Sequence, residues 1–472
     1  MEILHVSAEC YPVAKAGGLG DVVGALPKYL NQLGHIAKVV MPMYRTKFLH
    51  ANKWEVVHKG YTNMGTWWFE FTVIKEQTNS LGFDLYLIDI NGLLDREKIY
   101  GYDDDAERFM AFQIAVLDWV SAWKHHPDVI HVHDHHMGLI PFMVKHSFKY
   151  AAIKNVPTVL TIHNAQYQGW LGWENIALIP EWDTWRWGML DWKDTINPLA
   201  SGIKCADKVT TVSPSYLAEL QYMSNGLEAL FEYEKGKCVG ILNGIDADVW
   251  DPATDTYLNH HFSAADAEAG KAKSKMALCD AFDLDFEKPL IVFIGRLVGE
   301  KGADLLPQLI GDSFYFIGRR MNFLILGSGF PEVESGLAAL KPLAQYDYNV
   351  YIGYNEGLSH QMYAGADFLL MPSRVEPCGL NQMYSMRYGT IPMVRRIGGL
   401  KDTVIDYGEK GGYGICYDQT AVGDISHAVW RAVELYRDKE AMATVRKRMM
   451  ALDFSWENSV SKYADVYASV KR

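Results

Sequence analysis

Short apolar runs alternate with segments of helical periodicity along almost the entire chain. Several runs, such as residues 289–294, are continuously apolar, as is typical of strands buried on both faces of a sheet. The predicted strands are 2–7, 36–41, 84–90, 128–133, 156–162, 208–212, 289–294, 322–327, 348–353, 367–371 and 391–394. Helical periodicity is found in 21–34, 105–125, 301–310, 357–365 and 379–388. This alternation predicts βαβ units and therefore an α/β fold with parallel sheets.

The alternation is interrupted once, over residues 244–288, where the chain becomes polar before a new βα series begins at Pro289. A chain of 472 residues is long enough for about two or three domains. We therefore expect an N-terminal Rossmann-like domain over residues 1–243 and a C-terminal one over 244–453. In open α/β sheets, ligands bind beyond the carboxyl ends of the strands, so the loops after strands are the places to search for chemistry.

Charge and cysteine content narrow the class of protein. Lys and Arg number 45 and Asp and Glu number 57, which gives a formal net charge of −12. This acidic balance argues against nucleic acid as a partner, because phosphate backbones bind basic surfaces. The six cysteines are widely spaced without a CxxC pair, which is typical of a reducing compartment. With no apparent signal peptide or membrane span, we expect a cytoplasmic protein that does not bind membranes.

A glycine-rich loop follows the first predicted strand and reads Lys15-Ala16-Gly17-Gly18-Leu19-Gly20-Asp21. Glycines allow a backbone to approach a ligand closely, and the following helix N-terminus favours anionic groups. A dinucleotide site is disfavoured because the glycines begin well after the strand and the second strand ends without an acidic residue. A P-loop is excluded since the chain contains no GxxxxGK[ST] segment. From the spacing alone, ligand binding and a structural turn both remain open.

With its extension Val22-Val23-Gly24-Ala25-Leu26-Pro27, the loop resembles the amino-terminal signature of bacterial glycogen synthases and plant starch synthases. The resemblance implies the GT-B fold of retaining glucosyltransferases, in which two Rossmann-like domains with parallel sheets face a central cleft. It also implies that a final helix, here within 454–472, returns to the N-terminal domain. In that family the loop faces the nucleotide-sugar donor. The donor-binding residues implied for this loop are Lys15, Gly17, Gly18 and Asp21.

A cluster of histidines, His131-Val132-His133-Asp134-His135-His136, lies at the end of a predicted strand. These side chains are plausible metal ligands, but strand alternation sends His131 and His133 to one face and Val132 to the other. No further set of carboxylates and histidines completes a familiar metal site, so a ligand-facing strand end and a plain structural role remain open. The family carries a similar stretch, which implies that Asp134 and His135 contact the glucan acceptor or the donor without a metal.

Another histidine, His163, ends the apolar strand 156–162 and is followed by Asn164. A lone histidine is more often a hydrogen-bonded structural residue than a catalyst. His163 nevertheless matches the family histidine that contacts the transferred glucose, so the resemblance implies a catalytic role for it. The resemblance also implies that Asn164 contributes to acceptor binding.

Two cations, Arg296 and Lys301, occupy the loop after the strand 289–294. A departing nucleoside diphosphate needs such charges, because negative charge develops on it as its bond to the sugar breaks. From the residues alone, a solvated pair on a surface helix is the alternative. The family has Arg and Lys at these positions, which implies that both stabilise the departing diphosphate. Gly295 and Glu300 replace a Ser and a Gln that are common there.

The segment Pro372-Ser373-Arg374-Val375-Glu376-Pro377-Cys378-Gly379-Leu380 follows another buried strand and precedes a predicted helix. This spacing places Glu376 beside a helix N-terminus, where N–H groups can meet an anionic ligand. In the family the matching Glu contacts the donor glucose, and no covalent nucleophile is firmly assigned, so a catalytic positioning role is implied for Glu376. Cys378 is interpreted as a small buried side chain. The further donor-binding residues expected here are Cys378, Gly379 and Leu380.

Two other segments resemble donor-binding parts of the family. Gly398-Gly399 precedes a predicted helix and resembles the diphosphate loop, although Ile397 occupies a place where Thr is usual. Tyr354 matches the position whose ring stacks on the nucleotide base.

An acidic run, Asp103-Asp104-Asp105, precedes the predicted helix 105–125. It is predicted to cap that helix rather than to bind a metal.

The clearest departure from the family lies between residues 170 and 198, where four tryptophans are clustered. They are Trp182, Trp185, Trp187 and Trp192. Flat aromatic faces pack well on sugar rings, so the cluster is either a glucan platform or the packing of a divergent helix. Ala200 also stands where the family often has Lys, which leaves the acceptor contacts of this region open.

The resemblance implies transfer of glucose from ADP-glucose to the 4-hydroxyl at the non-reducing end of an α-1,4-glucan such as glycogen or starch, with retention of configuration. The nucleotide sugar is a substrate, and no cofactor or metal is expected. ADP-glucose is favoured over UDP-glucose by the resemblance alone, so a UDP-glucose-using synthase or another GT-B glucosyltransferase stays open. A non-catalytic glucan-binding relative predicts decay of the donor site, and it is disfavoured because the expected residues are present, namely Lys15, His163, Arg296, Lys301 and Glu376.

Overall fold

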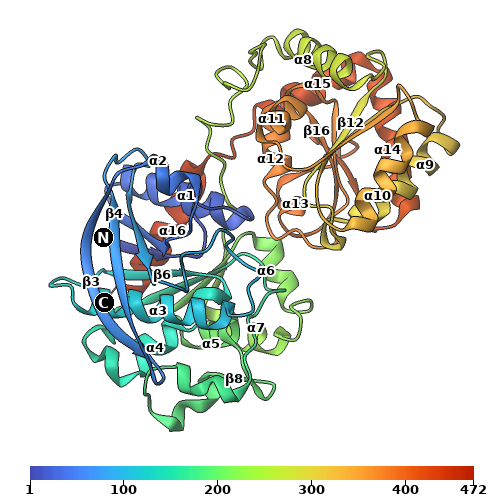
Figure 1. The fold of residues 1–472 in the computed structure, drawn as a ribbon. Helices are drawn as coiled ribbons and strands as arrows, with labels where there is room; N and C mark the ends of the chain where they lie inside the picture. The colour runs from blue at the N-terminus through green and yellow to red at the C-terminus, as the bar shows by residue number, and fades with distance from the viewer. Residues whose placement is uncertain (472) are drawn as a thin grey trace. The chain divides into compact units, whose positions relative to one another are not determined.

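In the computed structural model, which describes residues 1–471, the chain forms two compact α/β units (Figure 1). The first unit comprises Met1–Gly244 and the chain from Trp456 onward, and the second comprises Ile245–Ser455. At the start and end of the second unit the chain pairs with itself, through a parallel bridge between Ile245 and Ser455.

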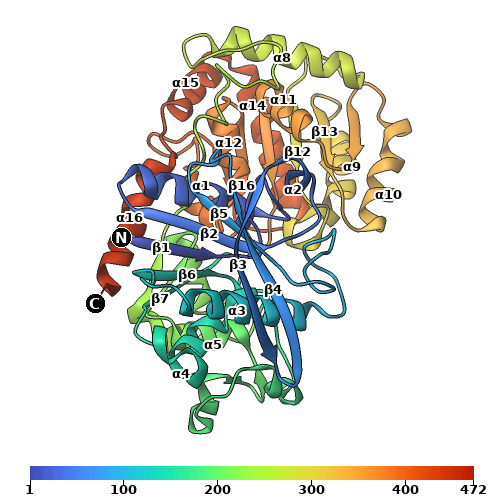
Figure 2. The same ribbon diagram turned by 60° about the vertical axis from the view of Figure 1, so that its left-hand side comes forward.

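The first unit is built on a nine-stranded sheet with the order β11-β10-β7-β6-β1-β2-β5-β4-β3 (Figure 2). Its mutually parallel strands are β1 (Glu2–Val6), β2 (Ile36–Pro42), β5 (Asp84–Asp89), β6 (Val129–His133), β7 (Thr158–Ile162), β10 (Lys208–Thr211) and β11 (Cys238–Gly240). The two remaining strands, β3 (Trp54–Met64) and β4 (Trp67–Glu76), form an antiparallel hairpin on one edge. A separate small ribbon pairs β8 (Asp191–Trp192) with β9 (Thr195–Ile196).

The edge hairpin is missing from the strands predicted by apolar runs. Most residues of β3 are exposed or half-exposed, and only one face of β4 is buried, through Phe69, Phe71 and Val73. An edge hairpin of this kind alternates between polar and apolar positions instead of forming a continuous apolar run. A search for buried parallel strands therefore passes over it.

The helices of the first unit include one from the far end of the chain. They are α1 (Gly18–Gln32), α2 (Lys47–Ala51), α3 (Asp105–Ser121), α4 (Ile140–His146), α5 (Pro198–Cys205), α6 (Pro214–Leu220), α7 (Glu228–Glu234) and α16 (Trp456–Val470). Helix α16, red in Figure 1, buries Trp456 and Tyr463 in one apolar cluster with Ile3 of β1 and Leu26 of α1. The Trp456 ring also stacks on Tyr29, with ring centroids 6.4 Å apart. Packing of this apolar face explains why α16 belongs to the first unit.

The second unit has a six-stranded, wholly parallel sheet with the order β14-β13-β12-β15-β16-β17. Its strands are β12 (Leu290–Ile294), β13 (Asn322–Gly327), β14 (Tyr348–Ile352), β15 (Phe368–Met371), β16 (Ile391–Arg395) and β17 (Ile415–Tyr417). Its helices are α8 (Ala267–Phe282), α9 (Leu306–Phe316), α10 (Pro331–Leu340), α11 (Glu356–Gly365), α12 (Asn381–Arg387), α13 (Gly398–Thr403), α14 (Val422–Arg437) and α15 (Lys439–Met450). This strand order is that of the doubly wound Rossmann fold. The α/β class with two Rossmann-like domains is therefore confirmed.

Each sheet has a point at which the strand order reverses. In the first unit the point lies between β1 and β6, and in the second it lies between β12 and β15. Loops on the two sides of such a point lead away in opposite directions, and ligands bind beside them at the carboxyl ends of the strands. Most of the predicted site residues lie in the loops after these four strands. Within each unit, the topology therefore brings them to the edge of the sheet where a ligand is expected.

The helix predicted over 301–310 begins later than expected. Two single 3-10 turns, Gly299–Lys301 and Ala303–Leu305, precede α9, and Gly302 separates them with a φ of +66°. A Cβ at Gly302 would lie 2.1 Å from the carbonyl oxygen of Pro372, so only glycine fits where the loops after β12 and β15 touch. This close approach holds Lys301 in a loop instead of a helix.

The predicted capping role of the Asp103–Asp105 run is wrong. Asp104 does occupy the N-cap position of α3, but its side chain makes no capping hydrogen bond. The Asp104 carboxylate pairs with Arg96 at 2.8 Å, and Asp105 forms an ion pair with the buried Arg108. The carboxylates of Asp104 and Asp105 therefore bind arginine side chains instead of the backbone N–H groups of the helix start, because a charged guanidinium is the stronger hydrogen-bond donor.

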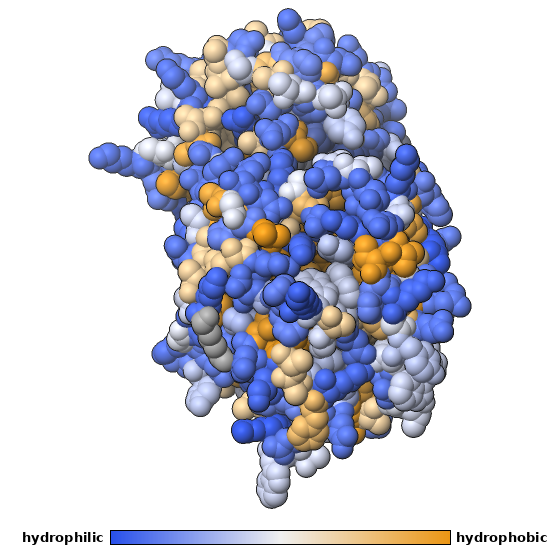
Figure 3. Space-filling view, turned by 90° about the vertical axis from the view of Figure 1, so that its left-hand side faces the viewer, coloured by the Kyte–Doolittle hydropathy of each residue, from blue (hydrophilic) through white to orange (hydrophobic). Residues whose placement is uncertain are grey.

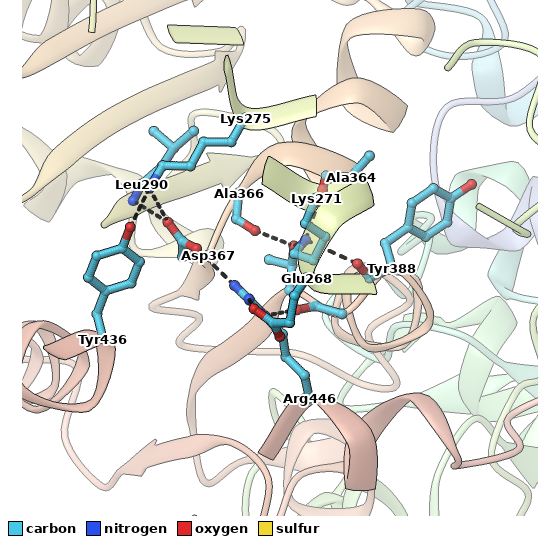
Figure 4. A network of polar contacts seen from close by, with 12 residues as sticks. Glu268, Lys271, Lys275, Leu290, Ala364, Ala366, Asp367, Tyr388, Tyr436 and Arg446 are labelled. Carbon is cyan, nitrogen blue, oxygen red and sulfur yellow. Dashed lines mark hydrogen bonds and ion pairs between the residues drawn. The ribbon is translucent and has the colours of Figure 1, made fainter. Parts of the chain in front are cut away.

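A buried polar network ties α8 and α15 to the sheet of the second unit (Figure 4). Asp367, just before β15, accepts from Lys275 of α8 and from Arg446 of α15, each at 2.8 Å, and from the Leu290 amide at 2.9 Å. Lys271, one turn before Lys275, is also buried and donates to carbonyl oxygens at the ends of α11 and α12. Burial alone would raise the pKa of Asp367, but the two cations hold it below its usual value.

Exposed large apolar residues lie both singly and in neighbouring pairs, such as Tyr61 stacked on Trp68. On the face shown in Figure 3, hydrophilic residues predominate and hydrophobic ones lie singly or in small groups. Within residues 1–471, no helix has the length and apolar character needed to cross a membrane. All six cysteines are free thiols, and five of them are buried.

Candidate active site

The glycine loop of the first unit is held by a buried carboxylate that the sequence reasoning missed. Glu9 lies just beyond β1, and its Oε2 accepts the backbone N–H groups of Ala16 at 2.6 Å and Gly17 at 3.0 Å. Its Oε1 accepts the hydroxyl of Tyr100 at 2.7 Å. A lone carboxylate directly after a buried strand was the signal available in the sequence. Glu9 fixes the loop from the inner side and leaves its other side for a ligand.

The predicted donor residues of this loop lie together at the start of α1. Lys15 and Asp21 form an ion pair of 2.8 Å, and α1 begins at Gly18. Gly17 has an extended backbone that any residue can adopt, and a Cβ built on it would meet no atom within 4 Å. Neither conformation nor packing within the chain therefore demands glycine at position 17. This favours close approach of a ligand over the structural-turn alternative.

Asp134 lies at the end of β6 in a strained backbone conformation. Its φ is +58° with ψ of −177°, a region that residues other than glycine rarely adopt. Its Oδ1 accepts the backbone N–H of His163 at 2.7 Å, which ties the loop after β6 to the loop after β7. Burial raises the pKa of Asp134 to about 7, against the opposing effect of these backbone hydrogen bonds. The carboxylate is thus turned toward His163.

The other predicted acceptor residues have local partners. The rings of His135 and His136 pack with centroids 3.7 Å apart, and burial lowers the pKa of His135 to about 4. The Asn164 side chain accepts the backbone N–H of Gln166 at 3.0 Å, which shapes the turn after His163. Both residues lie at the carboxyl edge of the sheet beside Asp134.

His163 is largely buried and is the outermost of three hydrogen-bonded histidines. Its Nε2 lies 3.1 Å from Nδ1 of His133, and Nε2 of His133 lies 3.2 Å from Nδ1 of His5. Burial lowers the pKa of His5 and of His163 to about 3, and the pKa of His133 is also well below its usual value. The three rings are therefore neutral at physiological pH. His5 was missed because it lies inside the first strand, far from the cluster in sequence.

Three histidine nitrogens approach one another closely enough to suggest a metal site. His5, His131 and His133 each offer one ring nitrogen, all within 4.8 Å. Both nitrogens of His131 are engaged, with the Tyr467 hydroxyl at 2.8 Å and the Thr161 hydroxyl at 2.6 Å. Both nitrogens of His133 are engaged with other histidines, as described above. Because hydrogen bonds already use these lone pairs, the trio does not fit a metal ion.

In the second unit, the loops after β12 and β15 bring Lys301 and Glu376 together. Lys301 Nζ lies 2.7 Å from each carboxylate oxygen of Glu376, and the Ser373 hydroxyl donates to Glu376 Oε2 at 2.8 Å. Glu376 is only 6% exposed. The pair thus lies at the strand-order reversal between β12 and β15, with a buried carboxylate held by a cation and a hydroxyl. Ser373 was not singled out from the sequence.

Arg296 is placed differently from Lys301. Its side chain is 53% exposed and pairs with Glu300 at 3.3 Å, not with Glu376. Arg374, which the sequence reasoning did not assign, instead joins the two loops: it donates to the Gly299 carbonyl at 2.6 Å and forms a two-bond ion pair with Asp304. Arg296 is therefore paired within its own loop, while Arg374 connects the loop after β15 to the one after β12.

The glycine pair before α13 packs against the loop that carries Glu376. Gly398 has a φ of +47°, and a Cβ there would lie 2.0 Å from the Glu376 carbonyl oxygen. A Cβ at Gly399 would lie 2.0 Å from the carbonyl oxygen of Cys378. Cys378 itself is buried, in agreement with its interpretation as a small packing residue. Both glycines are thus required by backbone contact within the second unit.

The remaining donor residues lie near the same sheet edge. Gly379 adopts a φ of +73° and Leu380 is the N-cap of α12. The first residue of that helix, Asn381, donates to the carbonyl of Ile294 at 2.7 Å, which connects the start of α12 to the end of β12. Tyr354, after β14, is 76% exposed and its hydroxyl hydrogen-bonds Glu356. Its ring faces remain accessible for stacking.

The tryptophan cluster divides into two kinds of residue. Trp182 is buried against Phe142, with ring centroids 5.4 Å apart, and the Trp192 indole donates to the Gly226 carbonyl at 2.9 Å. Trp185 and Trp187 are 90% and 57% exposed. Packing therefore explains half of the cluster, and the other half presents open aromatic faces.

Comparison with known proteins identifies relatives over the full length of the chain. Residues 2–233 match the family model of the starch synthase catalytic domain, and residues 280–448 match that of the glycosyl transferases group 1. The chain is 54% identical over 467 residues to a glycogen synthase from Flavobacterium johnsoniae, covering 99% of this chain and 98% of that protein. It is 40% identical over 485 residues to a glycogen synthase from Anaeromyxobacter, covering 100% and 99%.

A solved structure agrees with these relatives. The catalytic domain of starch synthase IV from Arabidopsis thaliana, bound to ADP and acarbose, superposes with a TM-score of 0.91 at 30% identity and covers 100% of this chain and 99% of that one. The resemblance read from the sequence and the GT-B fold that it implied are confirmed. The chain therefore belongs to the glycogen and starch synthase family of glycosyltransferases.

Proposed function

We propose that the enzyme transfers glucose from ADP-glucose to the 4-hydroxyl at the non-reducing end of an α-1,4-glucan, with retention of configuration. The observation that carries the proposal is the Lys301–Glu376 pair at the strand-order reversal of the second unit. The bound ADP of the Arabidopsis starch synthase IV structure supports an adenine nucleotide as the donor's leaving group. UDP-glucose is the alternative donor, since no residue described above discriminates the base.

On the donor side, the chemistry requires charge. The bond between sugar C1 and the diphosphate oxygen breaks with its electron pair staying on the diphosphate. The acceptor 4-hydroxyl bonds to C1 from the same face, and its proton passes to the departing diphosphate oxygen. Lys301 and Arg296 of the second unit are assigned to stabilise the departing diphosphate, and Lys15 of the first unit is assigned to donor binding by the family resemblance. Glu376 is assigned to hold the donor glucose. Both its oxygens are already bound by Lys301, which suits a positioning carboxylate better than a nucleophile.

The other donor contacts are assigned to backbone and ring surfaces. Gly17 supports close approach because a Cβ built on it would meet no atom of residues 1–471 within 4 Å. The exposed ring of Tyr354 is assigned to stack on the nucleotide base. The remaining donor-binding assignments are Gly18 and Asp21 in the first unit and Cys378, Gly379, Leu380, Gly398 and Gly399 in the second.

On the acceptor side, His163 is assigned to contact the transferred glucose. Its Nε2 is used internally, so Nδ1 is the ring nitrogen that can meet a substrate oxygen. Asp134 is assigned a positioning role, because its carboxylate binds the backbone N–H of His163. His135 and Asn164 complete the proposed acceptor edge, where their loops converge on that of Asp134.

One assay separates the main alternatives. Purified enzyme is given glycogen with either ADP-glucose or UDP-glucose, and glucan-dependent nucleotide release is measured together with chain extension. Faster release from ADP-glucose is expected, whereas faster release from UDP-glucose would overturn the donor assignment. Release from neither donor would overturn the synthase function and favour a non-catalytic glucan-binding relative. Lys301→Ala and Glu376→Gln should cut turnover severely, while Lys341→Ala and Glu332→Gln, at exposed positions of the same unit, serve as matched controls.

The free cysteines support a proposed site of action. All six are thiols without a disulfide, as expected for a reducing compartment such as the cytoplasm. Cell fractionation with an antibody against the chain tests this proposal. Recovery in an oxidising compartment would contradict it.

A further inference from the structure

Three histidines form a continuous hydrogen-bonded line from the interior of the first unit to its carboxyl edge. We name His5, His133 and His163 the histidine chain. His5 lies in β1, His133 ends β6, and His163 follows β7. The two links, of 3.2 Å and 3.1 Å, each join Nδ1 of the inner ring to Nε2 of the next. The chain thus begins at a nitrogen deep in the core and ends at Nδ1 of His163.

Neutral imidazoles restrict this line to two arrangements. Each neutral ring has one N–H and one lone pair, so His133 can donate through Nδ1 only if it accepts at Nε2. In the outward arrangement every ring carries its proton on Nδ1, and His163 presents an N–H to the site. In the inward arrangement every ring carries its proton on Nε2, and His163 presents a lone pair. The choice made at His5 is therefore transmitted to His163.

The inner end of the chain decides between the two arrangements. Nε2 of His5 is buried and has no hydrogen-bond partner among the described residues 1–471. The neighbouring ring of His131 cannot supply one, because both its nitrogens are engaged with Tyr467 and Thr161. In the inward arrangement this nitrogen would carry an unsatisfied N–H, whereas in the outward one it carries an unsatisfied lone pair. Buried N–H groups without partners are the rarer and costlier case.

We propose that the histidine chain fixes His163 as the Nδ1–H tautomer, so that His163 donates a hydrogen bond to a hydroxyl or ring oxygen of the sugar. His5 and His133 are then positioning residues that act through His163. The identity of the acceptor atom as a sugar oxygen rests on the proposed function, but the tautomer does not. Asp134 complements the chain because it holds the backbone of the same residue.

The tautomers can be read directly by nitrogen NMR. In protein labelled with ¹⁵N-histidine, long-range ¹H–¹⁵N correlations distinguish a protonated Nδ1 from a protonated Nε2 in each ring, and single substitutions assign the signals. Protonated Nδ1 is expected in His5, His133 and His163. A protonated Nε2 in His163 would overturn the proposal. This measurement needs no substrate, so its outcome stands even if the enzyme fails to use ADP-glucose.

Two substitutions of nearly equal shape test the transmission. His5→Asn keeps an N–H close to the position of Nδ1, whereas His5→Leu leaves Nε2 of His133 without a donor. His5→Leu is expected to mix the tautomers of His163 and to lower kcat by about tenfold, as for the loss of one neutral hydrogen bond. His5→Asn should retain the Nδ1–H tautomer and most of the activity, and His125→Leu, at an exposed position, is the control. If the Asn and Leu variants give equal tautomer signals for His163, then the tautomer of His163 does not depend on His5 and the proposal is overturned, even where one variant is less stable.

Discussion

The pairing of Lys301 with Glu376 makes a quantitative prediction about catalysis. Lys301→Met keeps the length and apolar stem of the side chain and removes only its charge. A charge-assisted hydrogen bond contributes about 1.5–3 kcal/mol, so losing the one assigned to the departing diphosphate should lower kcat roughly 10- to 100-fold. KM for the donor should change less, because the charge that Lys301 meets is larger in the transition state than in the bound donor.

The same substitution leaves a second consequence in the folded protein. Glu376 is buried, and among residues 1–471 it would keep the Ser373 hydroxyl as its hydrogen-bonding side-chain partner. A buried charged group that loses its partner costs about 1–3 kcal/mol or more, so Lys301→Met should also lower the stability of the second unit. Adding Glu376→Gln removes the orphaned charge. The double variant should therefore be more stable than Lys301→Met alone.

A double-mutant cycle measures this coupling. The wild type, both single variants and the double variant are compared by thermal unfolding and by steady-state kinetics with glycogen as acceptor. For groups in direct contact, the coupling energy is expected to be about 1–3 kcal/mol. Losses that simply add, in both stability and kcat, would show that the two residues act independently. That result would refute the reasoning from their contact.

Three further changes test other parts of the structure. Asp367→Asn leaves two buried cations without a carboxylate and should destabilise the second unit by about 3–5 kcal/mol, measured by urea unfolding at pH 7. Because the folded pKa of Asp367 is depressed, its contribution is complete above its unfolded pKa of about 4 and is lost as the pH falls through the folded value, so the difference between wild type and variant should shrink in acid. Glu9→Gln keeps one oxygen for the two backbone N–H groups but places an NH₂ group where Oε1 accepts the Tyr100 hydroxyl and removes the carboxylate charge, and it should lower kcat/KM about tenfold in the release assay. Trp185→Ala with Trp187→Ala should weaken binding to glycogen in co-sedimentation and leave turnover of short maltooligosaccharides unchanged if these rings are a glucan platform, whereas unchanged binding would assign them to the surface alone.

The sequence predicted the sheets well because buried parallel strands are continuous apolar runs. The strand 289–294 and the ends of β1, β6 and β15 were all visible in this way, and with them the loops that carry the candidate site. The β3–β4 hairpin was not visible, since its exposed face breaks the apolar pattern. The late start of α9 depends on contact between Gly302 and Pro372, two positions whose approach only the folded sheet reveals.

In the candidate site, residues in loops were predicted from the sequence, whereas the buried residues that support them were not. Residues that face a ligand lie in loops after strands, where their chemistry is conspicuous, and Lys301 and Glu376 were found there. Supporting groups such as Glu9, Ser373 and His5 are polar residues in or beside apolar runs, and no sequence motif singles them out. Their roles depend on the register that sets β1 beside β6 and β12 beside β15. An unpartnered buried polar group is costly, so these hidden residues constrain their neighbours. In the histidine chain, Nε2 of His5 has no hydrogen-bond partner among residues 1–471, and this selects the ring nitrogen of His163 that carries the proton.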